Sequence, residues 1–164
     1  MGSISQLHPA IVHFPIALTL TGFLFLVIGY LKRPDFKRFS VYILILAFLS
    51  SFIAVYTGSR AGEEMKEIPN IEQALEKHAD MGENIRWALG ICAILGIIAL
   101  SNLSGRKAVG FLFFLAYLLS AVLVGYTGYL GGELVLEHGA GYRHIMELGG
   151  DSTSDEESLA EQGI

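Results

Sequence analysis

Four long stretches of the 164-residue chain are almost free of charged residues, and this pattern limits the folds open to it. The stretches cover residues 11–31, 39–57, 87–103 and 108–130. Each approaches the roughly 20 apolar residues that a helix needs to cross a bilayer. Because a lipid-exposed backbone must satisfy its own hydrogen bonds, such segments cross as helices. The sequence therefore predicts an all-α fold, an integral-membrane four-helix bundle in a lipid bilayer.

Composition supports this class, because 52% of the residues are hydrophobic and 16% are charged, whereas soluble domains carry about a quarter charged residues. We predict one transmembrane domain over residues 1–148 and an acidic, disordered tail over residues 149–164. The four helices are predicted at about residues 9–31, 39–60, 71–103 and 107–138.

Basic residues predict how the bundle is oriented. The connection between the first two helices holds Lys32, Arg33, Lys37 and Arg38, and the connection before the fourth helix holds Arg106 and Lys107. Short loops rich in Lys and Arg face the cytoplasm. Apart from Asp35, every acidic residue lies in residues 58–84 or beyond residue 132. We therefore expect a protein of the inner (cell) membrane with both termini on the outer, periplasmic side.

An internal repeat appears when the chain is compared with itself at an offset of 70 residues. YTGSRAGEE at residues 56–64 matches YTGYLGGEL at residues 126–134, and His8 falls on His78. The repeat predicts two helical hairpins in the same orientation, related by an axis along the membrane normal. Each copy carries a GxxxG pair, which lets helices approach closely in lipid. The four packing glycines are Gly58, Gly62, Gly128 and Gly132, and we expect them to draw the outer ends of the second and fourth helices together.

All five histidines fall on the predicted outer side, at or just beyond helix ends. Helical periodicity predicts that three of them face inward, one from each of three helices. His8 shares a face with Val12, Pro15 and Thr19; His78 with Ile71, Leu75, Gly82 and Ile85; His138 with Leu130 and Leu134. We expect these three imidazoles at similar heights. His13 points elsewhere, one turn deeper.

Such a cluster suits two kinds of ligand. Two axial imidazoles on facing helices of a four-helix bundle hold b-type haem, and nearby glycines would make room for the macrocycle. The candidate ligands are His8, His13, His78 and His138, and the favoured pair is His78 with His138 or His8. A transition-metal ion held by His78, His138 and Glu133 is an alternative. The third interpretation is that the histidines anchor helix ends and bind nothing.

Two segments resemble a known family. LHPAIVHFPIAL near the start and GYLGGELVLEHGAG near the end are similar to a family of four-helix bacterial and archaeal proteins, described only as predicted membrane proteins of unknown function. The resemblance covers residues 7–142. The family pattern is carried by His8, Pro9, His13, Pro15, Gly131, Gly132, Glu133, His138 and Gly139. Some members are joined to Rieske-type or cytochrome c modules, which implies a redox setting.

The leading functional hypothesis is a redox module that binds haem b and passes electrons between a membrane donor and an outer cytochrome or Rieske protein. A cofactor-free structural or assembly subunit and a metal-binding membrane protein are the alternatives. The single cysteine, Cys92, has no CxxCH context, which excludes covalent c-type haem. No nucleophile–base set, phosphate loop or basic nucleic-acid patch is apparent, so we expect neither an enzyme nor nucleic-acid binding. Because the spans contain almost no ionisable residues, a pump or channel is not expected.

Overall fold

A computed structural model describes residues 7–66, 70–101 and 106–140 of the chain, and this part is helical and contains no strand. The helices are α1 (His8–Ile11), α2 (His13–Leu31), α3 (Phe36–Met65), α4 (Glu72–Leu100) and α5 (Arg106–His138). The short α1 runs through Val12 into α2, and together they form one candidate span, His8–Leu31. Four helices are thus long and apolar enough to cross a membrane, which confirms the all-α class.

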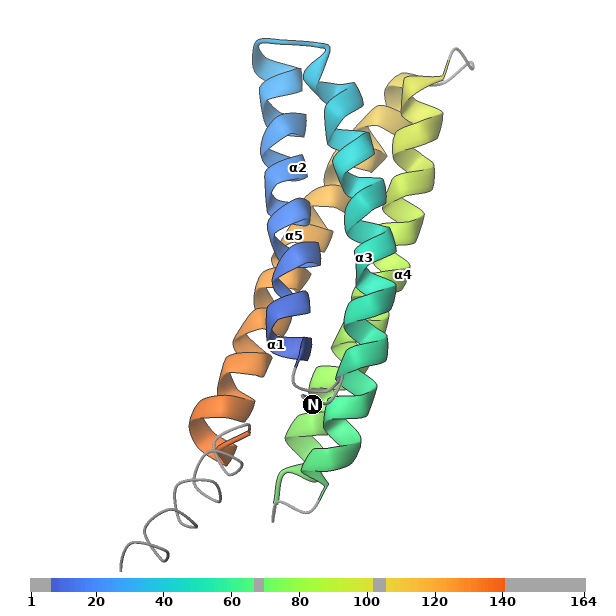
Figure 1. The fold of residues 1–164 in the computed structure, drawn as a ribbon. Coiled ribbons are helices and arrows are strands. Elements are labelled where there is room, and N and C mark those ends of the chain that lie inside the picture. The colour runs from blue at the N-terminus through green and yellow to red at the C-terminus, as the bar shows by residue number, and fades with distance from the viewer. Residues whose placement is uncertain (1–6, 67–69, 102–105, 141–164) are drawn as a thin grey trace, which may run out of the picture.

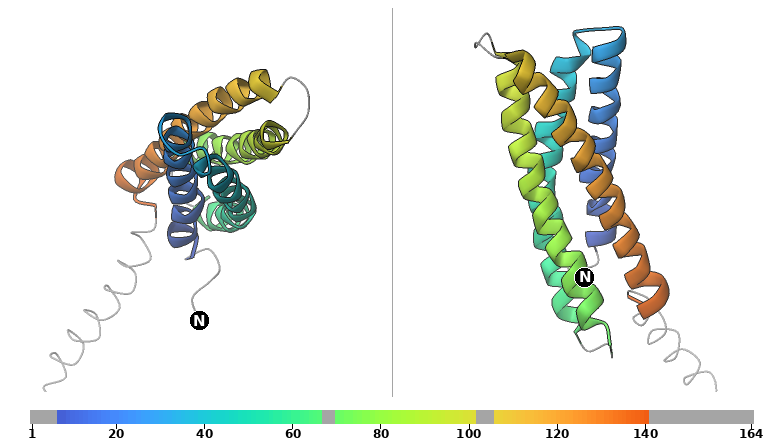
Figure 2. Two further views of the ribbon diagram at one scale, coloured as in Figure 1. Left: turned by 90° about the horizontal axis from the view of Figure 1, so that it is seen from above. Right: turned by 180° about the vertical axis from the view of Figure 1, so that it is seen from behind.

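Two helical hairpins with the same orientation make up the bundle (Figure 1). In Figure 1 and in the right view of Figure 2, the α2–α3 connection, the end of α4 and the start of α5 lie at one end of the bundle, and the start of α1 lies toward the other. We call the first the basic end, marked by Lys32, Arg33, Lys37 and Lys107, and the second the histidine end, marked by His8, His78 and His138. α2 packs on α3 and α4 on α5, and the α3–α4 and α2–α5 contacts join the hairpins.

The bundle is apolar both inside and outside, as expected for a protein solvated by lipid. Leu26, Leu44, Leu89 and Tyr117 are fully buried in its centre. Large apolar side chains such as Trp87 point outward on all helices. Three buried serine hydroxyls bond to their own helix: Ser40 donates to Lys37 O, Ser51 to Phe48 O and Ser120 to Ala116 O. No partner from another helix is then needed.

The helices differ from the predicted ranges mainly where they leave the apolar stretch. The second predicted helix, 39–60, is α3, which begins at Phe36 and ends at Met65. The third, 71–103, is α4 and ends at Leu100. Hydropathy locates the lipid-crossing part of a helix, whereas helical hydrogen bonding continues through polar residues beyond it. The predicted tail, 149–164, lies outside the described residues.

The expected glycine contact between the second and fourth helices is absent. Within the described residues, no Cα atoms of α3 and α5 lie within 8 Å of each other. Gly128 and Gly132 of α5 have open space where a Cβ would stand, while Gly62 of α3 faces Leu75 of α4. Gly58 faces a histidine side chain instead of a helix backbone. On α3 the two glycines of the GxxxG pair thus face side chains of His8 and Leu75, not the backbone of α5.

Candidate functional site

His8 is held against α3 at the histidine end. The helix begins at His8, and Pro9 occupies the first turn of α1, where its missing N–H costs nothing. The His8 imidazole, which is half-buried, packs over Gly58: a Cβ at that glycine would lie 2.9 Å from His8 Cε1. Its Nδ1 is 3.1 Å from Thr57 Oγ1. Glycine at position 58 is therefore what allows the ring to approach α3 so closely.

The Thr57 hydroxyl identifies which His8 nitrogen carries the hydrogen. Thr57 Oγ1 donates its own hydrogen to the carbonyl oxygen of Ile53 at 2.9 Å. A hydroxyl that donates to its own helix is left as an acceptor for other groups, which favours the His8 tautomer that carries its hydrogen on Nδ1. The lone pair is then on Nε2, the nitrogen available to a metal. A hydrogen bond to the non-ligating nitrogen is the usual support of a metal-binding imidazole.

His78 is held against α5 in a similar way. It belongs to the predicted inward stripe of α4, in which Ile71 and Ile85 are buried. A Cβ at Gly131 would lie 3.2 Å from His78 Cε1. His78 Nδ1 is buried and has no hydrogen-bond partner among the described residues. An unpaired buried imidazole nitrogen is costly, which marks this residue as a candidate ligand or donor.

The two imidazoles meet where the hairpins adjoin. The His8 and His78 ring centroids are 6.5 Å apart, and the ring planes are inclined by 82°. One ring comes from the first hairpin and the other from the second, at positions matched by the 70-residue repeat. We call His8 and His78 the histidine pair. Thr57, Gly58 and Gly131 are the residues that contact its two rings.

The remaining predicted ligands lie elsewhere. His138 ends α5, seven residues after Gly131, or roughly 10 Å farther along a helix. Its Nδ1 is also buried without a partner in the described part of the chain. His13 is exposed, and its Nδ1 donates to the carbonyl oxygen of Pro9 at 2.5 Å. Three inward imidazoles at one height are therefore not found, and His144 falls outside the described residues.

The alternative metal set is not assembled. Within residues 7–66, 70–101 and 106–140, no group of three or more His, Cys, Asp or Glu side chains is placed to hold a metal ion. His78, His138 and Glu133 do not converge. Two arginines near the pair form ion pairs with acids of their own helix, Arg86 with Glu83 and Arg60 with Glu63. These carboxylates are thus engaged by arginines rather than by the imidazoles.

Sequence reasoning missed two parts of the site. It did not assign Thr57 as the His8 partner, although the repeated Tyr-Thr-Gly motif marked that position. It also expected glycines to make room for a macrocycle, whereas Gly58 and Gly131 make room for the imidazoles themselves. For Thr57 and Gly58 the signal was the repeat, which matches a histidine to a histidine and a Thr-Gly to a Thr-Gly at one offset; it did not point to Gly131, because it pairs Gly58 with Gly128.

Comparison with known proteins gives one match. The model of a family described as "Predicted membrane protein (DUF2231)" matches residues 5–144, which include every helix and both members of the histidine pair. No curated protein and no solved structure matches the chain.

Proposed function

The chain belongs to this family of predicted membrane proteins of unknown function, and we propose that it is a multi-pass redox module in which His8 and His78 hold one b-type haem. The observation that carries the proposal is the pairing of two imidazoles from different hairpins, with ring centroids 6.5 Å apart. Metal–imidazole nitrogen bonds of about 2 Å put the centroids of two rings on one ion roughly 6 Å apart. The observed separation is close to that value.

The number of ligands favours haem over a bare metal ion. Haem iron takes four equatorial nitrogens from its macrocycle and needs one or two axial ligands from the protein. A structural or catalytic transition-metal ion takes three or four protein ligands. The histidine pair supplies two, and among the described residues no third His, Cys, Asp or Glu joins them. When bound, haem would supply one-electron chemistry, while the two hairpins supply its axial imidazoles.

The surroundings of the pair also suit a bound group. His8 keeps its Nε2 lone pair free because Nδ1–H is engaged by Thr57. His78 presents a buried Nδ1 with no partner within the described residues. Both rings are half-buried at the end of an apolar bundle. Low solvent access is one of the conditions by which a protein tunes the potential of a haem.

The basic connections support an orientation for electron transfer. Lys and Arg gather at the end opposite the histidine pair, and loops of that kind stay on the cytoplasmic side. The histidine end then faces the periplasmic side of the inner membrane. A haem held by His8 and His78 in that position would be able to exchange electrons with a membrane donor on one side and an outer cytochrome or Rieske protein on the other.

A cofactor-free structural or assembly subunit is the second candidate, and one observation favours it. The His8 and His78 rings already touch edge to face and occupy the space over Gly58 and Gly131. In this interpretation the pair is a polar contact that fixes one hairpin against the other. Its removal would then loosen the bundle without changing any spectrum.

The test is a dithionite-reduced minus air-oxidised absorption spectrum of the full chain, purified in mild detergent from haem-replete cells. We expect a sharp α-band and a shifted Soret peak. His8→Ala and His78→Ala should each abolish the low-spin signal. His13→Ala is the matched control, because His13 is an exposed histidine on the same helical segment, and it should keep the full signal.

Three results would contradict the proposal. A flat spectrum from wild-type protein excludes haem and leaves the structural candidate. A normal spectrum from both His8→Ala and His78→Ala excludes the pair as ligands. Loss of the signal in His138→Ala, with His8→Ala unaffected, would move the second ligand to the end of α5.

A further inference from the structure

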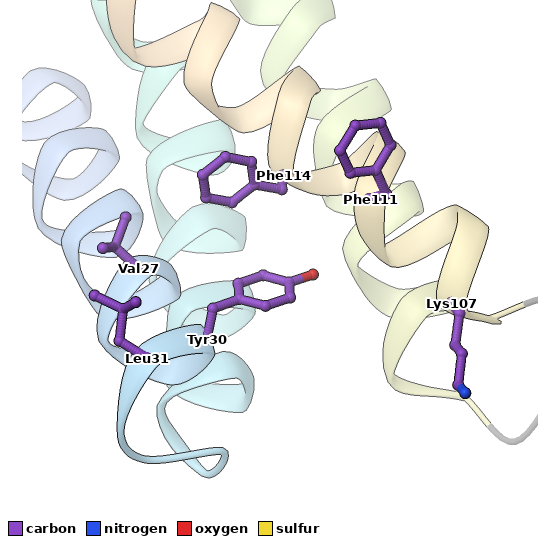
Figure 3. Close-up of a pocket in the computed structure, with 6 residues that line it drawn as sticks. All are labelled: Val27, Tyr30, Leu31, Lys107, Phe111 and Phe114. Carbon is purple, nitrogen blue, oxygen red and sulfur yellow. The ribbon is translucent and has the colours of Figure 1, made fainter.

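A cleft opens between α2 and α5 at the basic end, opposite the histidine pair (Figure 3). Its volume is about 330 Å³, and it is lined by Val27, Tyr30, Leu31, Lys107, Phe111 and Phe114. A second hollow of about 450 Å³ shares Tyr30 and Lys107 with it and also includes Lys37 and Gly110. We call the two together the basic-end cleft. None of its residues belongs to the proposed haem site.

Tyr30 gives the cleft a fixed wall. Its hydroxyl donates to the carbonyl oxygen of Gly110 at 2.8 Å, which links α2 to α5. Its ring packs edge to face on Phe114, with centroids 5.6 Å apart. Figure 3 shows the Tyr30 ring directed from α2 toward α5, with the two phenylalanines on the facing helix. Because both ends of this side chain are held, the cleft is a built feature of the helix pair.

Two lysines stand beside this apolar wall. Lys37 Nζ lies 3.7 Å from the centroid of the Tyr30 ring, and its stem packs against Gly29, where a Cβ would lie 2.7 Å from Lys37 Cγ. Lys107 is exposed at the start of α5. The two ion pairs found among the described residues, Arg60–Glu63 and Arg86–Glu83, lie toward the histidine end. Neither Lys37 nor Lys107 therefore has a carboxylate within 4 Å in that part of the chain.

The sequence explains why these charges stay uncompensated. Asp35 is the one acidic residue in residues 1–62, and residues 84–132 contain none. Asp35 is the residue that precedes α3, and its side chain makes no capping hydrogen bond to the helix. The basic end therefore offers two ammonium groups next to an apolar surface, and within the described residues neither of them is paired with Asp35 or another carboxylate.

From this juxtaposition we propose that the basic-end cleft binds an anionic phospholipid. One acyl chain lies along the α2 and α5 side chains of the wall, and the headgroup phosphate lies between Lys37 and Lys107. Basic pockets between membrane helices are known to take anionic lipid headgroups. The proposal does not depend on the haem hypothesis, because its residues and its end of the bundle are different.

The wall identifies a lipid rather than a dissolved anion. Leu31 is 73% exposed and Phe111 is 63% exposed, so the cleft opens on the face that the bilayer covers. A soluble phosphate would meet two lysines and no further donor from Val27 or Phe114. An anionic phospholipid matches both parts of the cleft. Its acyl chain packs against the apolar wall, and its phosphate pairs with the two lysines, which have no carboxylate partner among the described residues.

The experiment is native mass spectrometry of the full-length protein with equimolar phosphatidylglycerol and phosphatidylcholine of identical acyl chains. Each lysine near an anionic headgroup contributes about a fivefold preference, so two lysines predict roughly a 25-fold excess of phosphatidylglycerol adducts. Lys37→Gln with Lys107→Gln should bring that ratio close to one. Lys66→Gln with Lys77→Gln removes the same charge from the histidine end and should leave the preference unchanged.

Two further arms separate lipid from other causes. Leu31→Gln keeps both lysines and should lower the total number of retained lipids of either kind, while thermal unfolding confirms that each variant is folded. An excess of inorganic phosphate should not displace phosphatidylglycerol. Equal ratios in the wild type and the Lys37/Lys107 variant would overturn the proposal. Full competition by inorganic phosphate would also overturn it, because the cleft would then recognise a free anion.

Discussion

The crossing of α2 over α5 depends on a contact between Gly22 and Tyr117, and replacing the glycine should destabilise the bundle. Tyr117 is fully buried, and its hydroxyl faces Gly22. A Cβ at position 22 would overlap that hydroxyl oxygen. Overpacking of this kind costs about 1–3 kcal/mol, and alanine returns about 0.5–1 kcal/mol of helix propensity. Gly22→Ala should therefore lower the free energy of unfolding by about 0.5–2 kcal/mol.

The same geometry predicts the opposite sign for Tyr117→Phe. The Tyr117 hydroxyl is buried and has no hydrogen-bond partner among the described residues. An unpaired buried polar group costs about 1–3 kcal/mol, and removing it offsets the small void left behind. Tyr117→Phe should therefore raise stability by about 1 kcal/mol. In the double variant the alanine methyl occupies the space of the lost hydroxyl, so the two effects should couple by at least about 1 kcal/mol.

The assay is reversible unfolding in mixed micelles with a rising mole fraction of sodium dodecyl sulfate, followed by circular dichroism. Gly125→Ala is the matched control on α5, because nothing lies within 4 Å of a Cβ there. It should be neutral or slightly stabilising, with or without Tyr117→Phe. The reasoning is refuted if the effects of Gly22→Ala and Tyr117→Phe are additive, or if Tyr117→Phe destabilises the bundle by more than about 1 kcal/mol.

Three shorter predictions concern single positions. Gly58→Ala should displace His8 from Thr57, since the new Cβ would lie 2.9 Å from the ring, and the ¹⁵N imidazole signals of His8 should shift. Gly128, which the repeat matches to Gly58, faces open space, so Gly128→Ala should leave those signals unchanged. Trp87 is the single tryptophan and is 64% exposed, so brominated lipids should quench most of its emission; quenching by aqueous iodide instead would place this face in water. Cys92 is fully buried and should resist maleimide until dodecyl sulfate unfolds the bundle; rapid labelling in mild detergent would contradict its packing.

Much of the fold follows from patterns that depend on few interactions. Hydropathy identifies segments that lipid can solvate, and a continuous apolar segment of about 20 residues satisfies its own backbone hydrogen bonds there as a helix. Helical spacing also found the buried face of α4, where Ile71 and Ile85 are both buried. Whether a segment is helical, and which of its faces is buried, depends mainly on that helix and the lipid around it. A single sequence therefore carries enough information to predict them.

The candidate site required information that spacing does not contain. Periodicity assigns a residue to a face, but its height relative to another helix depends on tilt and on where each helix enters the bundle. His138 faces inward like His78, yet it lies seven residues beyond the glycine that contacts His78. Small residues have the same limitation: Gly58 permits close approach, and only the assembled bundle reveals that the approaching group is an imidazole.

The internal repeat is broken at the histidine pair, and this asymmetry gives the site its chemical character. In the first hairpin His8 packs over Gly58 and bonds to Thr57. The repeat would place His78 over Gly128 and beside Thr127. It packs instead over Gly131, three residues farther along α5, and its contact with Thr127 is to the backbone of that residue, whereas His8 bonds to the Thr57 hydroxyl. Because the second imidazole has moved along the helix, its Nδ1 is left buried and unpaired while Gly128 is left uncovered. Two copies of one hairpin thus hold their imidazoles differently: His8 Nδ1 bonds to a threonine hydroxyl, whereas His78 Nδ1 has no partner within the described residues. A cofactor-free contact would gain stability from pairing both nitrogens, so the unpaired one is the stronger argument for a ligand between the hairpins.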